Sequence, residues 1–253
     1  MRGFSHLNLH TEALEEAKNF YVRQCGLGVS RDDGNENAAF LSSGSNHHEV
    51  EIFRDDRPFV RHMGLEYDSP AELEACLHRL EGSAAIIERL SLVPGLMQSI
   101  FCRDLEGNGL HLFANLTTDW RAWQKGESGQ AETWVVDPTR PPDRTSYPAA
   151  PLDVQHPPDS KRFASRFLGG GLAAAAPDAL RPFYTDVLGY TEILQMDGGS
   201  QSAGGGNNRL VIEPAGAGTP PGLAWISFAL SGLASPETLR DPLGLTVHLL
   251  PAA

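Results

Sequence analysis

Cysteine is scarce in this chain, and its few thiols form no recognisable framework. Cys25, Cys76 and Cys102 are an odd, scattered set without a Cys-x-x-Cys pair, which indicates buried thiols in a reduced compartment rather than disulfides. No apolar run approaches the roughly 20 residues of a membrane-spanning helix. The sequence also enters a strand-like segment at once, without the charged and apolar regions of a signal peptide. We therefore expect a cytoplasmic protein.

Positive charge is in deficit as well. The 20 lysines and arginines face 32 aspartates and glutamates, which gives a net charge of −12 and argues against nucleic acid or an anionic membrane as partner. The glycine-rich segment 198–206 lacks the Gly-Lys-Ser/Thr of a phosphate-binding loop, so it predicts a flexible turn.

What the sequence does contain is three histidines in short alternating segments: His6 in SHLNLH, His62 in RHMGLEY and His111 in GNGLHLF. Successive side chains of a strand point to opposite faces, so each histidine lies on the face opposite its aliphatic neighbours. Three imidazoles on the polar side of three strands are a candidate divalent-metal site, because neutral imidazole binds Zn, Fe, Ni and Cu. The alternative is that each is an ordinary, partly buried histidine.

The chain also repeats itself. Three segments recur in the same order: NFYVRQCG at 19–26 as PFYTDVLG at 182–189, NHHEVEI at 46–52 as GNNRLVI at 206–212, and DLEGNGLHL at 104–112 as DPLGLTVHL at 241–249. An ordered set of matches is typical of a duplicated unit. We therefore predict an N-terminal unit (residues 1–115), a connector (116–163) and a C-terminal unit (164–253).

The N-terminal unit predicts two helices among strands. One helix covers 12–25, with Thr11 as its N-cap candidate, and the other covers 70–81, with a capping box from Ser69 to Glu72. Strand-like runs surround them at 5–10, 38–42, 48–53, 62–67, 97–103 and 109–114. Strand, helix and strands, twice over, predict an α+β fold in which a curved, mostly antiparallel sheet carries its helices on the outer face.

The other two segments carry less chemistry. The connector is rich in proline and holds Trp120, Trp123 and Trp134, which we expect to anchor it to a surface. In the C-terminal unit nothing titratable matches His6, and Trp225 replaces His62. The short span from Trp225 to His248 leaves little room for a second helix and hairpin. We therefore expect the chemistry to belong to the N-terminal unit.

Taken together, these motifs resemble the vicinal oxygen chelate superfamily, which includes glyoxalase I, bleomycin-resistance and fosfomycin-resistance proteins, methylmalonyl-CoA epimerase and extradiol ring-cleaving dioxygenases. The residues that carry the resemblance are SHLNL at 5–9 with the helix ending FY…GLG, HMGLE at 62–66, and DLEGNGLH at 104–111. The resemblance implies a cup built from tandem modules of paired βαβββ units. It also implies a divalent metal held by the first, fifth and eighth strands.

Residue by residue, the resemblance places His6 and His62 on two of the family's metal positions and His111 on the third. Most members carry Glu at that third position. An imidazole there raises the charge of the site by one and shifts its preference away from hard, oxygen-loving metals. Fe(II) is the metal we favour, with Zn, Ni and Co as alternatives, and loss of the metal is a further alternative.

The segment 46–52 supports two assignments. A match to the dioxygenases makes His48 the residue that exchanges protons with the substrate, whereas a match to glyoxalase I and the epimerase makes Glu51 a fourth metal ligand. The two residues are three apart, so a regular strand cannot aim both into the cup without a bulge. Strand parity favours Glu51, motif resemblance favours His48, and both assignments stay open.

Three classes of function follow. The first is an extradiol-type ring-cleaving dioxygenase acting on a catechol-like substrate, although Phe101 stands where those enzymes carry a tyrosine ten residues before the third ligand. The second is a lyase or isomerase of the glyoxalase or epimerase type. The third is a metal-free protein that binds a small aromatic molecule or drug. Each class implies an aromatic or diol ligand and a monomer or homodimer.

Overall fold

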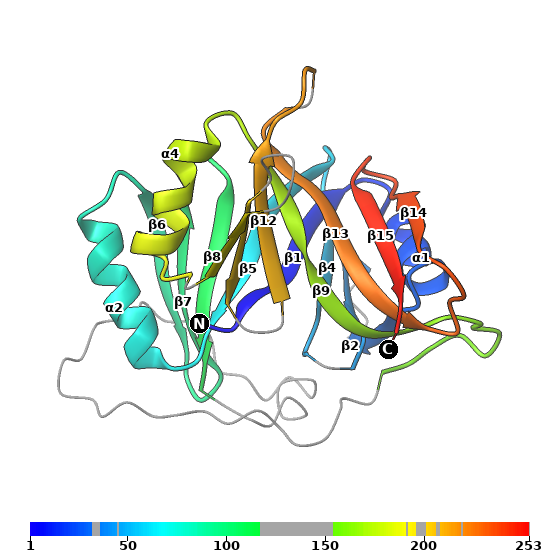
Figure 1. Cartoon of the computed structure of the whole chain (residues 1–253). Coiled ribbons are helices and arrows are strands. Elements are labelled where there is room, and N and C mark those ends of the chain that lie inside the picture. Colours follow the sequence, from blue (N-terminus) through cyan, green and yellow to red (C-terminus); the bar gives the residue numbers. More distant parts are fainter. Residues whose placement is uncertain are drawn as a thin grey trace.

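One continuous network of strands runs through the protein, with helices on its outer side (Figure 1). The structure is a computed structural model that describes residues 1–31, 36–44, 46–116, 154–190, 192–195, 201–205, 208–218 and 220–252. Within these residues it is a mixed α+β fold of fifteen strands and few helices. The predicted fold class is confirmed. Trp120, Trp123 and Trp134 of the connector lie outside the described residues.

The N-terminal unit contains two strand–helix–strands sets in succession, as the sequence predicts. Its elements are β1 (Gly3–Thr11), α1 (Leu14–Arg23), β2 (Gly28–Arg31), β3 (Ala38–Ser42), β4 (Val50–Arg54), β5 (Phe59–Tyr67), α2 (Pro70–Glu81), β6 (Ile86–Val93), β7 (Met97–Arg103) and β8 (Gly109–Asn115). β1 joins the two sets by pairing antiparallel with β5, while β4 and β8 run parallel to β1 and β5.

The C-terminal unit begins in the same way and then becomes shorter. Its elements are β9 (Phe163–Ala174), α4 (Pro177–Pro182), the π-helical turn η1 (Phe183–Val187), β10 (Glu192–Gln195), β11 (Gln201–Gly205), β12 (Asn208–Pro214), β13 (Gly222–Ser231), β14 (Glu237–Arg240) and β15 (Thr246–Pro251). No helix lies between β13 and β14, where residues 232–236 are all described. β11 pairs with β10 and β12, so the prediction of a flexible turn over 198–206 is wrong for residues 201–205.

Alternation of side chains gives the sheet one apolar face. Leu7, Met63, Leu65, Leu110 and Leu112 are fully buried on this face and belong to a core shared by both units. Burying this face contributes about 25 cal/mol for each Å² of apolar surface removed from water. The opposite face of the same strands is therefore left to polar side chains.

Two local predictions have different outcomes at the helix starts. The helix over 70–81 is confirmed, and Ser69 caps it by accepting a hydrogen bond from the Glu72 amide (3.3 Å). Thr11 instead ends β1, and α1 begins three residues later without a side-chain cap. The Thr11 hydroxyl accepts from the amide of Ala13 (3.1 Å) and shapes the turn between strand and helix.

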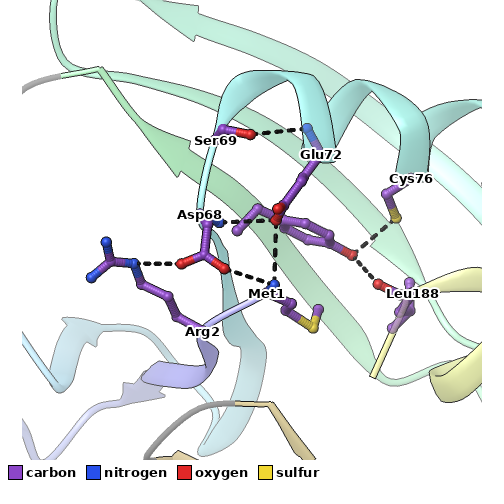
Figure 2. Close-up of polar contacts among 8 residues, drawn as sticks. Met1, Arg2, Asp68, Ser69, Glu72, Cys76 and Leu188 are labelled. Carbon is purple, nitrogen blue, oxygen red and sulfur yellow. Dashed lines mark hydrogen bonds and ion pairs between the residues drawn. The ribbon is translucent and has the colours of Figure 1, made fainter. Parts of the chain in front are cut away.

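Polar contacts join the start of α2 to the N-terminus and the preceding Tyr67 to the C-terminal unit (Figure 2). The amino group of Met1 lies 2.9 Å from Asp68 Oδ2 and 3.3 Å from Glu72 Oε2. The Tyr67 hydroxyl donates to the carbonyl of Leu188 (2.7 Å), just after η1. The N-terminal and C-terminal units therefore meet beside α2, and Figure 1 shows α4 alongside this helix.

The two units are joined by a reciprocal pair of buried hydrogen bonds. Tyr21 of α1 donates to Asp241 Oδ2 (2.7 Å) in the turn before β15, and Tyr184 of η1 donates to Asp104 Oδ2 (3.0 Å) in the turn before β8. The two tyrosines belong to the repeated FY motif, and the two aspartates begin the repeated turn. Each unit thus places its helical tyrosine on the turn of the other.

Among the described residues, no helix combines the length and the apolar character needed to cross a membrane.

We expect Tyr21→Phe and Tyr184→Phe each to lower the free energy of unfolding by about 1.5–3 kcal/mol, because each removes a buried hydrogen bond to a carboxyl group. Urea denaturation measures the change. Tyr190→Phe is the matched control, since the Tyr190 hydroxyl is buried without a hydrogen-bond partner among the described residues. A loss of the same size in Tyr190→Phe would show that the two Tyr–Asp bonds are not the cause.

Candidate metal centre

Strand register brings the three sequence-predicted histidines together. His6 on β1 and His111 on β8 both pair with Gly64 of the strand between them, β5, which also carries His62 two residues earlier. One ligand atom from each of the three imidazoles lies within 4.8 Å of the others. His111 Nδ1 and His6 Nε2 are 3.3 Å apart. The spacing suits three nitrogens that face one ion.

Gly64 makes this cluster possible. A Cβ built on Gly64 would overlap the imidazole ring of His6, so only glycine leaves the ring room to lie across β5. The sequence alone shows Gly64 only as one residue of the predicted strand over 62–67. Its position opposite both His6 and His111 becomes visible only from the register.

The cluster is buried, and burial keeps its rings uncharged. Burial first, and neighbouring imidazoles second, hold the pKa of His6 and of His111 well below the usual 6.5. Burial likewise lowers the pKa of His62 to about 3, with His48 and Arg61 adding to the effect. Neutral imidazoles keep a lone pair for a metal at neutral pH.

Two hydrogen-bonding facts indicate which nitrogens remain available. His62 Nε2 is buried without a hydrogen-bond partner among the described residues, a state that costs about 1–3 kcal/mol unless something binds there. His111 Nε2 lies 2.9 Å from Ser99 Oγ on the neighbouring strand, which fixes the ring and leaves Nδ1 toward His6. A hydrogen bond to the outer nitrogen of a ligating histidine is usual in metal sites. The donor set therefore fits a divalent metal.

His48 and Glu51 both reach this site. The predicted strand over 48–53 starts only at Val50, so His48 precedes the strand and is free of its alternation. His48 Nε2 lies 3.9 Å from Glu51 Oε2, and His6, His48 and Glu51 form a second group of ligand atoms within 4.8 Å. Both residues therefore reach the site without the bulge that a regular strand over 48–53 would need.

Neighbouring side chains hold both residues. The Asn8 side-chain amide donates to Glu51 Oε2 (2.6 Å), and His47 and His48 are hydrogen-bonded through their Nδ1 atoms. The rings of His48 and His6 are 4.7 Å apart between centroids. Asn8 was not predicted as a site residue, although its place two residues after His6 gave the signal.

A cavity of about 530 Å³ opens onto the histidines. On one wall Phe101 stacks face to face on His111, with centroids 4.4 Å apart and planes 3° apart, and Arg89 lies 4.3 Å above the other face of Phe101. Such a volume suits one small organic molecule. The polar lining consists of His6, Asn8, His10, His48, Glu51, Arg61, His62, Glu88, Arg89, Arg103 and His111.

The corresponding place in the C-terminal unit is built differently. Trp225 on β13 donates from its indole nitrogen to Glu213 (3.1 Å) and lies edge-on to His248. A Cβ on Gly171 would overlap this indole, so here a glycine makes room for tryptophan rather than for histidine. The two potential metal-binding groups found among the described residues both lie in the N-terminal unit.

Comparison with known proteins bears on the family resemblance and the fold. The family model described as the Glyoxalase/Bleomycin resistance protein/Dioxygenase superfamily matches residues 3–112, which confirms the resemblance found in the sequence. A search of the curated proteins by sequence found no match.

Solved structures share the fold at low sequence identity. The Mn(II)-bound glyoxalase from Novosphingobium aromaticivorans has a TM-score of 0.69 and 14% identity over 98% of this chain and 81% of its own. BphC, a halotolerant catechol dioxygenase, has a TM-score of 0.65 and 12% identity over 100% of this chain and 87% of its own. A variant of homoprotocatechuate 2,3-dioxygenase from B. fuscum, in complex with HPCA, has a TM-score of 0.67 and 15% identity over 100% of this chain and 71% of its own.

We expect Gly64→Ala to weaken metal binding by at least about tenfold, because the new methyl group forces the His6 ring out of the cluster. Titration calorimetry with Mn²⁺ or Zn²⁺ measures the affinity, and circular dichroism checks the fold. Gly82→Ala is the matched control, since a Cβ there meets only ordinary contacts, 3.6 Å or more away. Unchanged affinity in a folded Gly64→Ala variant would contradict the role given to Gly64.

Proposed function

From the membership of residues 3–112 in the Glyoxalase/Bleomycin resistance protein/Dioxygenase superfamily, we propose that the protein is a metal-dependent enzyme. Its reaction is extradiol-type ring cleavage of a catechol-like substrate with dioxygen. The observation that carries the proposal is the cluster of three buried, uncharged imidazoles, with one nitrogen unsatisfied, on the wall of a cavity large enough for one aromatic ring.

His6, His62 and His111 are the residues that would hold the metal. Their all-nitrogen donor set suits Fe(II), Co, Ni and Zn better than hard ions such as Mg or Ca. Fe(II), when bound, supplies redox chemistry and open positions for a vicinal diol and oxygen. The protein supplies the neutral rings, the His111–Ser99 hydrogen bond that orients one of them, and the Gly64 backbone that gives another its place.

We assign proton transfer to His48. It lies on the cavity wall beside the metal ligands, at a centroid distance of 4.7 Å from His6, and its other nitrogen is hydrogen-bonded to His47. A histidine held in this way can accept a proton from a bound hydroxyl group and return it later, which typically contributes 10²–10⁴-fold to a rate.

Phe101 has a different role from the tyrosine found at this position in dioxygenases. It has no hydroxyl group to donate, and its ring instead covers one face of His111 and carries Arg89 on the other. We infer that Phe101 orients His111 and shields it from water, while hydrogen bonding to the substrate falls to His48 and Asn8.

The second candidate is a glyoxalase- or epimerase-type lyase or isomerase, and the position of Glu51 favours it. One of its carboxylate oxygens belongs to the group formed with His6 and His48, and Asn8 holds it at the cavity wall. In this mechanism Glu51 is a ligand or base and the metal acts as a Lewis acid without oxygen. The similarity to the Mn(II)-bound glyoxalase agrees with either candidate.

Metal content and oxygen consumption distinguish the candidates. We expect protein purified without oxygen to contain close to one iron per chain by elemental mass spectrometry, and His62→Ala to lose it. Oxygen uptake with catechols should fall at least 100-fold in His48→Gln, whose metal content stays unchanged. His78→Ala is the control, since His78 lies exposed on α2.

Each contrary result has a definite meaning. Zinc, nickel or cobalt in place of iron, without oxygen uptake, would replace the dioxygenase with the lyase or isomerase, and Glu51→Gln should then abolish activity. Failure to bind any metal, even after reconstitution, would contradict both enzymes and leave a protein that binds small aromatic molecules.

A further inference from the structure

We propose that the ligand of this cavity carries a carboxylate, which Arg61 and Arg89 bind on the cavity wall. The inference rests on the proposed function only in taking the histidine cluster as the place of the reacting diol. It adds the class of substrate: an aromatic acid rather than a neutral aromatic molecule.

Two strand irregularities lie at charged side chains that line the cavity. Along β1 and β5, Asn8 pairs with His62 and Leu9 pairs with Val60, so Arg61 is the extra residue of a bulge. Adjacent residues of a regular strand point to opposite faces, yet Arg61 and His62 both line the cavity. A bulge that turns a second side chain toward a site is a common feature next to active sites.

The same irregularity occurs on the facing wall. Ile87 pairs with Cys102 and Arg89 pairs with Phe101, so Glu88 is the extra residue of β6. Glu88 and Arg89 both line the cavity, and Glu88 is bound to Arg103 through a 2.6 Å ion pair.

Two of the positively charged side chains that line the cavity have no acidic partner among the described residues. Arg103 is neutralised by Glu88, and His10 is hydrogen-bonded to Asp55 (2.8 Å). Neither Arg61 nor Arg89 forms an ion pair with any described residue, although the chain carries a net charge of −12. Two guanidinium groups without a carboxylate partner in one cavity make a site for an anion.

The volume of the cavity and the order of side chains on its wall limit the size of the ligand. Arg89, Phe101 and His111 are stacked in that order, with successive separations of 4.3 and 4.4 Å. Phe101 thus lies between Arg89 and His111, and the cavity of about 530 Å³ accommodates an aromatic ring with a short acidic side chain. The contact of Arg89 with the Phe101 ring takes up none of its N–H groups in a hydrogen bond, and a guanidinium can bind a planar carboxylate through two of them.

Binding of non-reacting acids tests the proposal without relying on turnover. We expect phenylacetate to bind at least tenfold more tightly than phenylacetamide by titration calorimetry under anaerobic conditions. Arg61→Met with Arg89→Met should remove that preference, and each single variant should reduce it. Arg57→Met is the matched control, because Arg57 is exposed outside the cavity. Equal binding of acid and amide by the wild-type protein, or no binding of either, would overturn the proposal.

A second comparison identifies the anion. Phenyl phosphate that binds more tightly than phenylacetate would overturn the assignment to a carboxylate. With substrates, we expect kcat/KM for 3,4-dihydroxyphenylacetate to exceed that for 4-methylcatechol, and the arginine variants to erase the difference through KM. Arginine-dependent binding of phenylacetate without turnover of any catechol would contradict the proposed function and leave the carboxylate site intact.

Discussion

Burial of three uncharged imidazoles on one wall of a curved sheet is the constraint on which the rest of this structure depends. Taking a titratable ring out of water costs much less free energy in its neutral form than in its charged form, and the neutral ring keeps a nitrogen that needs a partner. His62 Nε2 has none among the described residues, whereas His111 shares one nitrogen with Ser99. Such an arrangement lowers the stability of the protein without metal. An ion that binds all three lone pairs at once would stabilise the folded state.

The same alternation that builds the core also builds this site. Leu7, Met63 and Leu110 face the shared core while His6, His62 and His111 face the cavity, so a shift of one residue in register would exchange the two sets. The reciprocal contacts of Tyr21 with Asp241 and of Tyr184 with Asp104 hold the turns that precede β15 and β8. β8 carries His111, so the contact between the two units also supports the site.

Much of this could be predicted from the sequence, because strand parity and helix caps are local. Patterns of a few residues are enough to identify the three histidines, the helix over 70–81 and the strands at 38–42 and 97–103. The predicted N-cap at Thr11 and the predicted strand start at residue 48 are wrong, because the ends of strands depend on pairing with distant strands. Arg61 and Arg89 were missed for the same reason: a bulge is defined by the partner strand, and parity alone places Arg61 away from His62. The roles of His48 and Glu51, the metal and the boundaries of the two units stay predictions.

The most direct test of the metal centre is anomalous diffraction at the iron absorption edge, from crystals grown anaerobically with ferrous iron. The account predicts a single strong peak enclosed by His6, His62 and His111, about 2.1 Å from one nitrogen of each ring, with Ser99 still hydrogen-bonded to the outer nitrogen of His111. A peak at any other place, or none between these rings in crystals that contain iron elsewhere, would contradict it.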